Sequence, residues 1–487
     1  MDKKSDTIYN RKLWGNLFSR KQKEKFFMQL VYKPSDKPGW GKTIVFALQQ
    51  VLAILAATIV VPVIVGNGMS QAAALFGAGV GTLVYLLFTK FKSPVFLGSS
   101  FAFIGSMGAA FAGAATASVG YLGIIIGAIF AGLVYVAISF IVKYAGTDWI
   151  EKVMPAAVIG PTVAVIGLSL AGNAIGDLTK GSVLNSLGKP TANPYVALVC
   201  GLVTLFTTIA CSVYGKKMLK MIPFIIGIVA GYLVATIFTV IGLIAEAPAL
   251  QVINFGLFKN MQWFPEFTFV QAFDGFKHLE GFGSYLGTVA VAYIPVAFVV
   301  FAEHLADHKN ISSIIEHDLL KDPGLDKTLL GDGVGSMVGA FFGGCPNTTY
   351  GESVGCVAIS GNASVITIIS AAVICILASF CAPLMTFLAT IPSCVMGGVC
   401  VALYGFIAVS GLKMIQKVDL EDNRNLFVVS VILIAGVGGM VLTFGKVTVT
   451  SVACALILGI LTNVLTHWKK DKKEEKPVEE VETTEVE

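Results

Sequence analysis

Long apolar runs separated by short polar segments dominate the pattern of this 487-residue chain. A helix that crosses the ~30 Å hydrocarbon core of a bilayer needs about 20 mostly apolar residues. Residues 43–89 contain no Asp, Glu, Lys or Arg and can form two such helices, while 352–381 can form a half-helix and a span. The pattern therefore predicts an all-α polytopic membrane protein with about 14 transmembrane segments. The remaining apolar runs are 96–112, 119–142, 153–172, 195–213, 221–243, 285–307, 328–343, 386–410, 425–443 and 447–466.

The composition and the placement of charges agree with this prediction. Apolar residues make up 55% of the chain and charged residues 13%, whereas soluble domains carry roughly 25% charged residues. With 14 crossings and a cytoplasmic N-terminus, 29 of the 34 Lys and Arg residues fall on the cytoplasmic side, as the positive-inside rule requires. We therefore expect a multi-pass protein of the plasma (inner) membrane with both termini in the cytoplasm. The net charge of +4 reflects that membrane face and indicates no nucleic-acid partner.

The two ends of the chain and the common motifs narrow the class further. Residues 1–41 are a basic segment that we expect in the cytoplasm, and 468–487 alternate Lys and Glu before becoming acidic, which predicts a disordered cytoplasmic tail. The chain has no Walker A pattern and no metal-type Cys pairing, so we expect no cofactor and no metal. The Gly-x-Ser-x-Gly pattern at 351–355 opens an apolar segment rather than a strand-turn-helix, which disfavours an enzyme.

Three carboxylates remain at membrane depth once the tails and loops are removed: Glu303, Asp307 and Glu352. An ionisable side chain there costs at least ~2.5–3.5 kcal/mol, so it indicates a substrate path, an ion site or a proton relay. Glu303 and Asp307 are four residues apart and share one helical face, with His304 beside them and His308 a turn beyond. The alternative is that Asp307 and His308 belong to the cytoplasmic end of the span and are simply solvated.

Two irregular stretches rich in Gly, Ser and Pro occupy comparable places in the two halves of the chain. Residues 91–105 hold the third crossing, and 343–352 hold the third crossing after the long outer loop. Seven crossings on each side of that loop make the second half an inverted copy of the first, and interrupted helices at matching positions of inverted repeats point to a transport site. We expect short half-helices there that direct backbone N–H groups at substrate carbonyl oxygens.

Three separate motifs carry a resemblance to a known family. They are LGSSFAFI at 97–104, AEH at 302–304 and PNTTYGE at 346–352, and together they resemble the bacterial uracil permeases of the nucleobase-ascorbate (xanthine/uracil) transporter family. The resemblance extends from about residue 42 to 466. It implies two inverted repeats of seven segments, with a short β-strand and a half-helix in each of segments 3 and 10.

The resemblance also implies a division into domains and a pairing of subunits. Segments 1–4 and 8–11 form a core domain and segments 5–7 and 12–14 a gate domain, and relatives form homodimers through the gate domain. The corresponding ranges are 42–146 (core, segments 1–4), 147–245 (gate, segments 5–7), 246–283 (extracellular loop), 284–383 (core, segments 8–11) and 384–467 (gate, segments 12–14).

The family's substrate contacts transfer residue by residue. The resemblance implies that Glu303 and Glu352 hydrogen-bond the pyrimidine ring and that the backbone amides near Phe101 and Gly351 bond its carbonyl groups. Two aromatic residues, Tyr350 and Tyr404, correspond to residues that pack around the base, although ordinary core aromatics are the alternative. Glu303, Asp307 and His304 are the candidates for proton coupling.

The chain departs from the family pattern at a few positions. Ser353 and Ser360 replace the Asn and the Thr of the family signature, and Asp307 stands where some relatives carry a His. Gln50 follows Gln49 in the first segment, where a Gln-His pair is common. These departures leave both pyrimidine-binding carboxylates intact and leave the coupling residue open.

The expected function is uracil import by proton symport through alternating access. A purine (xanthine or guanine) permease or a Na⁺-coupled permease of the same family is the nearest alternative. A channel or facilitator is an alternative of another class. An intramembrane enzyme is disfavoured, because no nucleophile-base pair or metal-ligand set accompanies the carboxylates.

Overall fold

The computed structural model describes residues 30–467, apart from 147–148, 150–151, 153, 186–188, 217, 278–281 and 445–446. The predicted disordered tail, 468–487, and most of the basic N-terminal segment lie outside the described residues. Helices follow the apolar runs of the sequence closely. In the first half they are α3 (Trp40–Val65), α4 (Gln71–Phe88), α5 (Ile104–Ala112), α6 (Ala117–Ala145), α8 (Ala156–Ser169), α9 (Ala171–Asp177), α10 (Pro194–Tyr214), α11 (Met218–Met221) and α12 (Pro223–Ile244).

The second half repeats this helical character after a connecting region of short turns. That region contains the 3-10 turns η1 (Pro248–Leu250), η2 (Phe255–Asn260) and η3 (Asp274–Lys277) and the helix α13 (Thr268–Phe273). The later helices are α14 (Phe282–Ile315), a π-turn η4 (Leu320–Gly324), α15 (Leu325–Gly343), α16 (Gly351–Ser360), α17 (Val365–Ser379), α18 (Ala382–Ala389), α19 (Ser393–Ile415), α20 (Asn423–Val437) and α21 (Ser451–His467).

Helix length and composition fit a multi-pass membrane protein. Within the described ranges, eight helices are long and apolar enough to cross a bilayer, and the pair α17 and α18, bent by 83°, can form a ninth span. Two shorter apolar helices, α20 and α21, follow near the C-terminus. Helices α5 and α16 have 9 and 10 residues, so at 1.5 Å per residue each reaches only about half of the hydrocarbon core. The predicted count of 14 includes these half-helices and stays a prediction.

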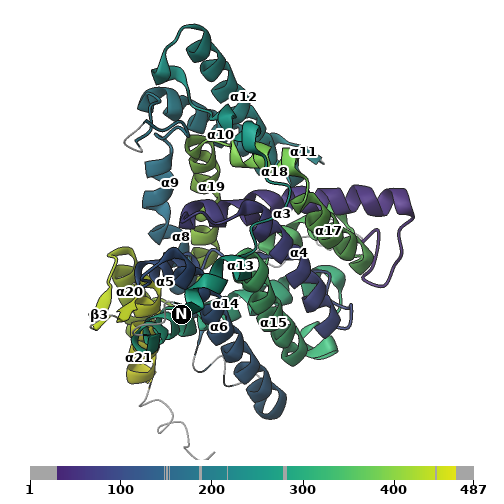
Figure 1. Cartoon of the computed structure of the whole chain (residues 1–487). Coiled ribbons are helices and arrows are strands. Elements are labelled where there is room, and N and C mark those ends of the chain that lie inside the picture. Colours follow the sequence, from purple (N-terminus) through teal and green to yellow (C-terminus); the bar gives the residue numbers. More distant parts are fainter. Residues whose placement is uncertain are drawn as a thin grey trace, which may run out of the picture.

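The helices pack in two groups (Figure 1). In one group α4 packs against α15 and α17, and α6 packs against α14 and α15. In the other, α19 packs against α8 and α10, α10 packs against α12, and α20 packs against α8 and α21. Close approach within the first group depends on small residues: a Cβ on Gly77 of α4 would lie 2.6 Å from the carbonyl oxygen of Gly339 of α15. The glycines of these helices therefore contribute to packing.

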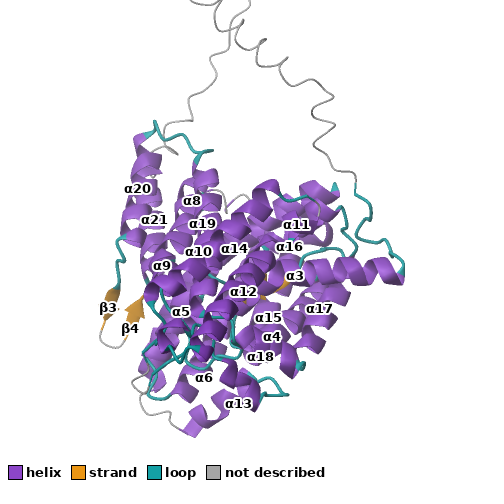
Figure 2. Cartoon of the chain, turned by 90° about the horizontal axis from the view of Figure 1, so that it is seen from above, coloured by secondary structure: helices purple, strands orange, loops and turns teal. Residues whose placement is uncertain are grey.

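Two short strands meet near the middle of the molecule, in the two segments where the family resemblance implies them. β1 (Leu97–Ser99) pairs antiparallel with β2 (Asn347–Thr349), with Gly98 opposite Thr348. Each strand precedes a half-helix, α5 or α16, so this pairing brings the N-terminal ends of both half-helices to the same region. A second hairpin, β3 (Leu442–Phe444) with β4 (Val447–Val449), lies at the edge of the helical body (Figure 2).

Candidate functional site

A cavity of about 390 Å³ lies between the two groups of helices. Its volume falls in the range of small-molecule sites, roughly 300–1,000 Å³. One wall comes from α14 and the length of α16, and the opposite wall comes mainly from α19 with contributions from α8, α10 and α12. The predicted site residues at its surface are Phe101, Glu303, Asp307, Tyr350, Gly351 and Glu352. Residues from both halves of the chain therefore share one cavity.

Helix α14 places two carboxylates on the same wall. Glu303 and Asp307 are one turn apart and both face the cavity, and the small side chains of Ala302 and Ala306 beside them also line it. These alanines leave room next to the carboxylates. Among the residues that the structure describes, no Lys or Arg forms an ion pair with either carboxylate or with Glu352. Their oxygens can therefore accept hydrogen bonds from a ligand.

Glu352 lies in the first turn of α16, directly after the strand β2. The first backbone N–H groups of a helix have no partner within it, and the helix dipole is positive at that end. Gly351 is exposed at the cavity and opens this helix. The start of α16 therefore offers N–H donors from the backbone beside an acceptor carboxylate from Glu352.

The two predicted aromatic contacts occupy different positions. Tyr350 lines the cavity, and its hydroxyl donates to the carbonyl oxygen of Ser99, 2.7 Å away. Its ring lies directly over Gly98, where any Cβ would collide with it. Tyr404 is only 2% exposed and packs edge-on against Phe101 at 5.9 Å between ring centroids. The structure thus places Tyr404 behind Phe101, outside the set of residues that line the cavity.

Asp307 accepts a hydrogen bond from the hydroxyl of Thr349 in β2, at 2.8 Å. This contact ties α14 to the strand that precedes α16. The alternative of a solvated Asp307 at the end of the span does not hold, because the carboxylate is partly buried and bonded. The same alternative is wrong for His308, whose side chain is fully buried.

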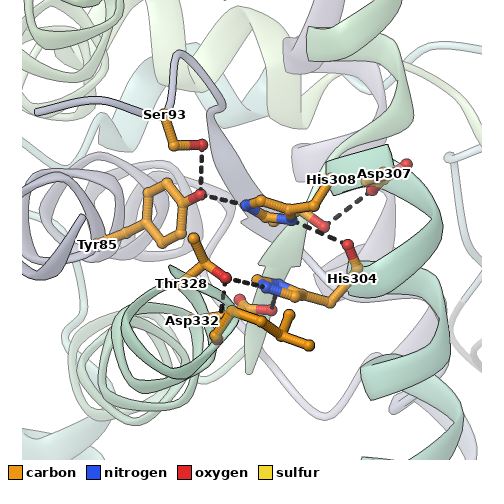
Figure 3. Close-up of polar contacts among 9 residues, drawn as sticks. Tyr85, Ser93, His304, Asp307, His308, Thr328 and Asp332 are labelled. Atoms are coloured by element: carbon orange, nitrogen blue, oxygen red, sulfur yellow. Dashed lines mark hydrogen bonds and ion pairs between the residues drawn. The ribbon is translucent and has the colours of Figure 1, made fainter. Parts of the chain in front are cut away.

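His304 lies apart from the cavity, although it is next to Glu303 in sequence. Its Nδ1 is 2.8 Å from Oδ2 of Asp332, and its Nε2 is 3.0 Å from the hydroxyl of Thr328 (Figure 3). Both His304 and Asp332 are buried, with 0% and 1% of their surface exposed. The structure therefore separates His304 from Glu303 and Asp307, with which the sequence groups it.

Asp332 corrects the count of three carboxylates at membrane depth. It is a fourth buried carboxylate, in the middle of α15, and it is not among the residues predicted from the sequence. A charged residue inside the apolar run 328–343 is itself an indication of a buried carboxylate. Asp332 stands between two glycines, however, so this segment resembles a Gly-rich loop.

A buried chain of polar side chains continues from His304 (Figure 3). The rings of His304 and His308 stack at 3.9 Å between centroids, and Nδ1 of His308 donates to the carbonyl oxygen of His304 at 2.9 Å. The hydroxyl of Tyr85 lies 2.7 Å from Nε2 of His308 and 2.6 Å from the hydroxyl of Ser93. This chain links α14 to α4 and α15 behind the cavity.

Two of the departures from the family pattern contact each other. The side-chain amide of Gln50 in α3 donates to the hydroxyl of Ser353, and that hydroxyl accepts a second hydrogen bond from the backbone N–H of Phe96 at 3.0 Å. Both side chains are buried. The pair therefore fixes the start of α16 next to Glu352. Comparing single positions with the family signature cannot reveal that these two residues contact each other.

A many-helix body with a partly polar cavity between two helix groups defines the class of multi-pass membrane transport proteins. A family model described as "Permease family" matches residues 41–444. The chain belongs to this family of xanthine/uracil permeases, so it is a transporter and not an enzyme.

Curated relatives and solved structures agree with this assignment. The chain is 38% identical to the uracil permease of Bacillus caldolyticus over 88% of this chain and 93% of the relative. It is 37% identical to the uracil permease of Bacillus subtilis (90% and 95% covered) and 34% identical to that of Escherichia coli K12 (88% and 91% covered).

Two solved structures share the fold at low sequence identity. They are the transmembrane domain of the cyanobacterial bicarbonate transporter BicA, with a TM-score of 0.57, 15% identity and 90% and 99% coverage, and the murine solute carrier 26 member A9 anion transporter, with a TM-score of 0.62, 12% identity and 96% and 74% coverage. At these identities the likeness concerns the fold alone.

Proposed function

We propose that this chain imports uracil by proton symport through alternating access. The observation that carries the proposal is that Glu303 and Glu352, from different halves of the chain, line one cavity without an ion-pair partner among the described residues. The names of the relatives, uracil permeases at 34–38% identity, support the same substrate.

The chemistry of uracil complements this cavity. The ring has two N–H donors and two carbonyl acceptors. Glu303 and Glu352 accept from the N–H groups, and backbone N–H groups near Phe101 and Gly351 donate to the carbonyls. Such a hydrogen bond contributes about 0.5–1.5 kcal/mol to a neutral carboxyl group and about 1.5–3 kcal/mol to a charged one, so two of them provide much of the specificity. Tyr350 and the ring of Phe101 pack around the base, with Tyr404 supporting Phe101 from behind.

Glu303 is the proposed proton carrier, with Asp307 as its neighbour on the same wall. An unpaired carboxylate at membrane depth is costly, so protonation lowers the cost of moving the loaded site across the bilayer. One inward proton gains roughly 2.3 kcal/mol per 100 mV of membrane potential. His304 is assigned an indirect part, because its ring bonds Asp332 and does not line the cavity.

Alternating access fits the position of the cavity between two helix groups. We assign α3, α4, α5, α6 and α14–α17 to the core domain and α8–α12 and α19–α21 to the gate domain. With α8 and α9 as one segment and α11 and α18 as connecting helices, these are 14 segments in two inverted repeats. Lys220 is exposed at one end of the cavity. Since basic residues mark the cytoplasmic side, this end is the inner one, and the conformation is open inward. We also propose that both termini are cytoplasmic, that the protein lies in the plasma membrane and that it forms a homodimer through the gate domain.

Counterflow of radiolabelled uracil in proteoliposomes tests the proposed function. The purified protein should exchange internal unlabelled uracil for external labelled uracil, and an imposed inward H⁺ gradient should drive accumulation where a Na⁺ gradient does not. Accumulation driven only by Na⁺, or competition by xanthine or guanine but not by uracil, would favour the alternative members of the family. Flux without saturation or accumulation would indicate a channel.

A further inference from the structure

The segment that precedes α3, residues 30–39, crosses the end of α16; we name it the strap. Val31 N–H and Tyr32 N–H both donate to the carbonyl oxygen of Gly361, at 2.7 and 3.2 Å. In return, the carbonyl oxygen of Tyr32 accepts from the N–H of Ala363 at 2.9 Å. Tyr32 and Asn362 form a parallel β-bridge. The strap is therefore joined by its backbone to the turn that ends α16.

Two further bonds extend this contact along the strap. The N–H of Val365 donates to the carbonyl oxygen of Pro34 at 3.1 Å, and the hydroxyl of Ser364 donates to that of Asp36 at 2.6 Å. Tyr32 is itself held to α3, because its hydroxyl accepts a hydrogen bond from Lys42 at 3.1 Å. The contacts run over the whole turn 361–364 and into the start of α17.

The strap also contacts α3, because the ring of Tyr32 packs edge-on against Phe46 at 6.1 Å between centroids and the carbonyl oxygen of Pro38 accepts from the hydroxyl of Thr43 at 3.0 Å. The strap borders a second cavity of about 670 Å³, whose other walls include Phe91, Lys92 and His317. The hydrogen bonds to the turn after α16 fix the strap together with these contacts to α3. The same bonds fix the turn in relation to α3.

Helix α16 is consequently held at both ends. Its N-terminal end is fixed by the Gln50–Ser353 contact, and its C-terminal end, where Gly361 has a positive φ of 67°, is fixed by the strap. The half-helix of the other half, α5, lacks a backbone strap among the described residues; its carbonyl at Ala110 accepts instead from the hydroxyl of Tyr285, at 2.9 Å. A ten-residue helix is rigid, so a displacement at Gly361 shifts Glu352 as well.

We propose that the strap is a positioning element of the substrate site, which holds α16 so that Gly351 and Glu352 keep their places at the cavity. This inference rests on the proposed function for the identity of the ligand, but the mechanical link between the strap and α16 does not. A segment outside the membrane spans would thereby set the affinity for a substrate bound between them. Loss of the strap contacts should weaken binding without removing any group that touches the substrate.

Substitution of Val31 in the full-length protein tests this proposal. Val31→Pro removes the N–H that bonds Gly361, whereas Val31→Ala keeps it, and the side chain is 61% exposed, so its loss alone changes little. Ser364→Ala removes the bond to Asp36, and Ser379→Ala, which loses only a bond within α17, is its control. The free energy of one hydrogen bond corresponds to a factor of about 2–12 in an equilibrium constant. The dissociation constant for uracil should therefore rise roughly 3- to 10-fold in Val31→Pro and in Ser364→Ala, and in neither control.

Hydrogen exchange measured on the same variants supplies a readout that does not need uracil. Val31→Pro should increase amide exchange in α16 and leave α5 unchanged relative to Val31→Ala. Unchanged exchange in α16 would overturn the proposal, and so would faster exchange in α16 with unchanged affinity for uracil. If the wild-type protein binds no uracil, the proposed function fails and the exchange comparison alone decides for or against the strap.

Discussion

The imidazole of His304 is bonded to the carboxylate of Asp332 at 2.8 Å, with both side chains almost entirely buried. Oδ1 of Asp332 has no hydrogen-bond partner among the described residues, so the bond from His304 to Oδ2 is the main polar contact of this carboxyl group. Removing one partner of a buried hydrogen bond costs about 1–3 kcal/mol, because the other group is left unsatisfied.

We therefore expect His304→Leu to lower the free energy of unfolding by about 1–3 kcal/mol, since it leaves the buried Asp332 side chain without this hydrogen bond. The double variant His304→Leu and Asp332→Leu should recover part of this loss. Thermal unfolding of the purified protein in detergent measures both. Equal stability of wild type and His304→Leu would show that the bond contributes nothing.

Thr349→Val should disturb Asp307, because the hydroxyl of Thr349 is its hydrogen-bond donor at 2.8 Å. Thr348→Val is a matched control in the same strand, since the hydroxyl of Thr348 has no hydrogen-bond partner in the described part of the chain. A hydrogen bond contributes about 0.5–1.5 kcal/mol to a neutral acceptor and about 1.5–3 kcal/mol to a charged one, so we expect a loss of stability of about 0.5–3 kcal/mol for Thr349→Val only. Similar stabilities for the two variants would contradict the assignment.

The Gln50–Ser353 contact should show coupling in a double-mutant cycle. Gln50→Ala and Ser353→Ala each break the same hydrogen bond, so the double variant should lose less stability than the sum of the single variants. Coupling energies between residues in contact are about 0.5–3 kcal/mol. Additive losses, measured by thermal unfolding, would mean that the two residues act independently.

The ion pair between Lys92 and Asp322, at 2.5 Å on the surface, predicts a pH dependence. The hydrogen bond from Lys92 lowers the pKa of the Asp322 carboxyl, and His317 nearby adds to the effect. A folded-state pKa below the unfolded value of about 3.9 stabilises the protein above that pH, and the contribution disappears as the pH falls through the folded-state pKa.

Lys92→Met should therefore have a lower unfolding temperature than the wild type at pH 7, and the difference should shrink in strong acid. High salt should reduce it too, because both side chains are about half exposed. A difference that is the same at every pH would exclude this ion pair as its cause.

The sequence predicts the parts of this molecule that depend on local pattern. Apolar runs locate the helices, Gly, Ser and Pro mark the interrupted segments that contain β1 and β2, and isolated charges mark Glu303 and Glu352. These features are visible because a charge or a helix breaker contrasts with its apolar surroundings.

Contacts between distant segments could not be predicted in the same way. The strap bonds a turn more than 300 residues away, and Gln50 bonds Ser353 across a similar separation. The side of α14 that His304 faces depends on Asp332 in another helix, and the place of Tyr404 depends on the ring of Phe101. Such relations follow from tertiary packing, which no single-segment pattern contains.

Uracil uptake by Glu303→Gln in proteoliposomes with an imposed inward pH gradient tests the central proposal most directly. Glu316→Gln, an exposed carboxylate just beyond the same helix, is the matched control. We predict that the wild type and Glu316→Gln accumulate uracil when the gradient is applied, whereas Glu303→Gln does not. Accumulation that survives Glu303→Gln undiminished would contradict the proposal.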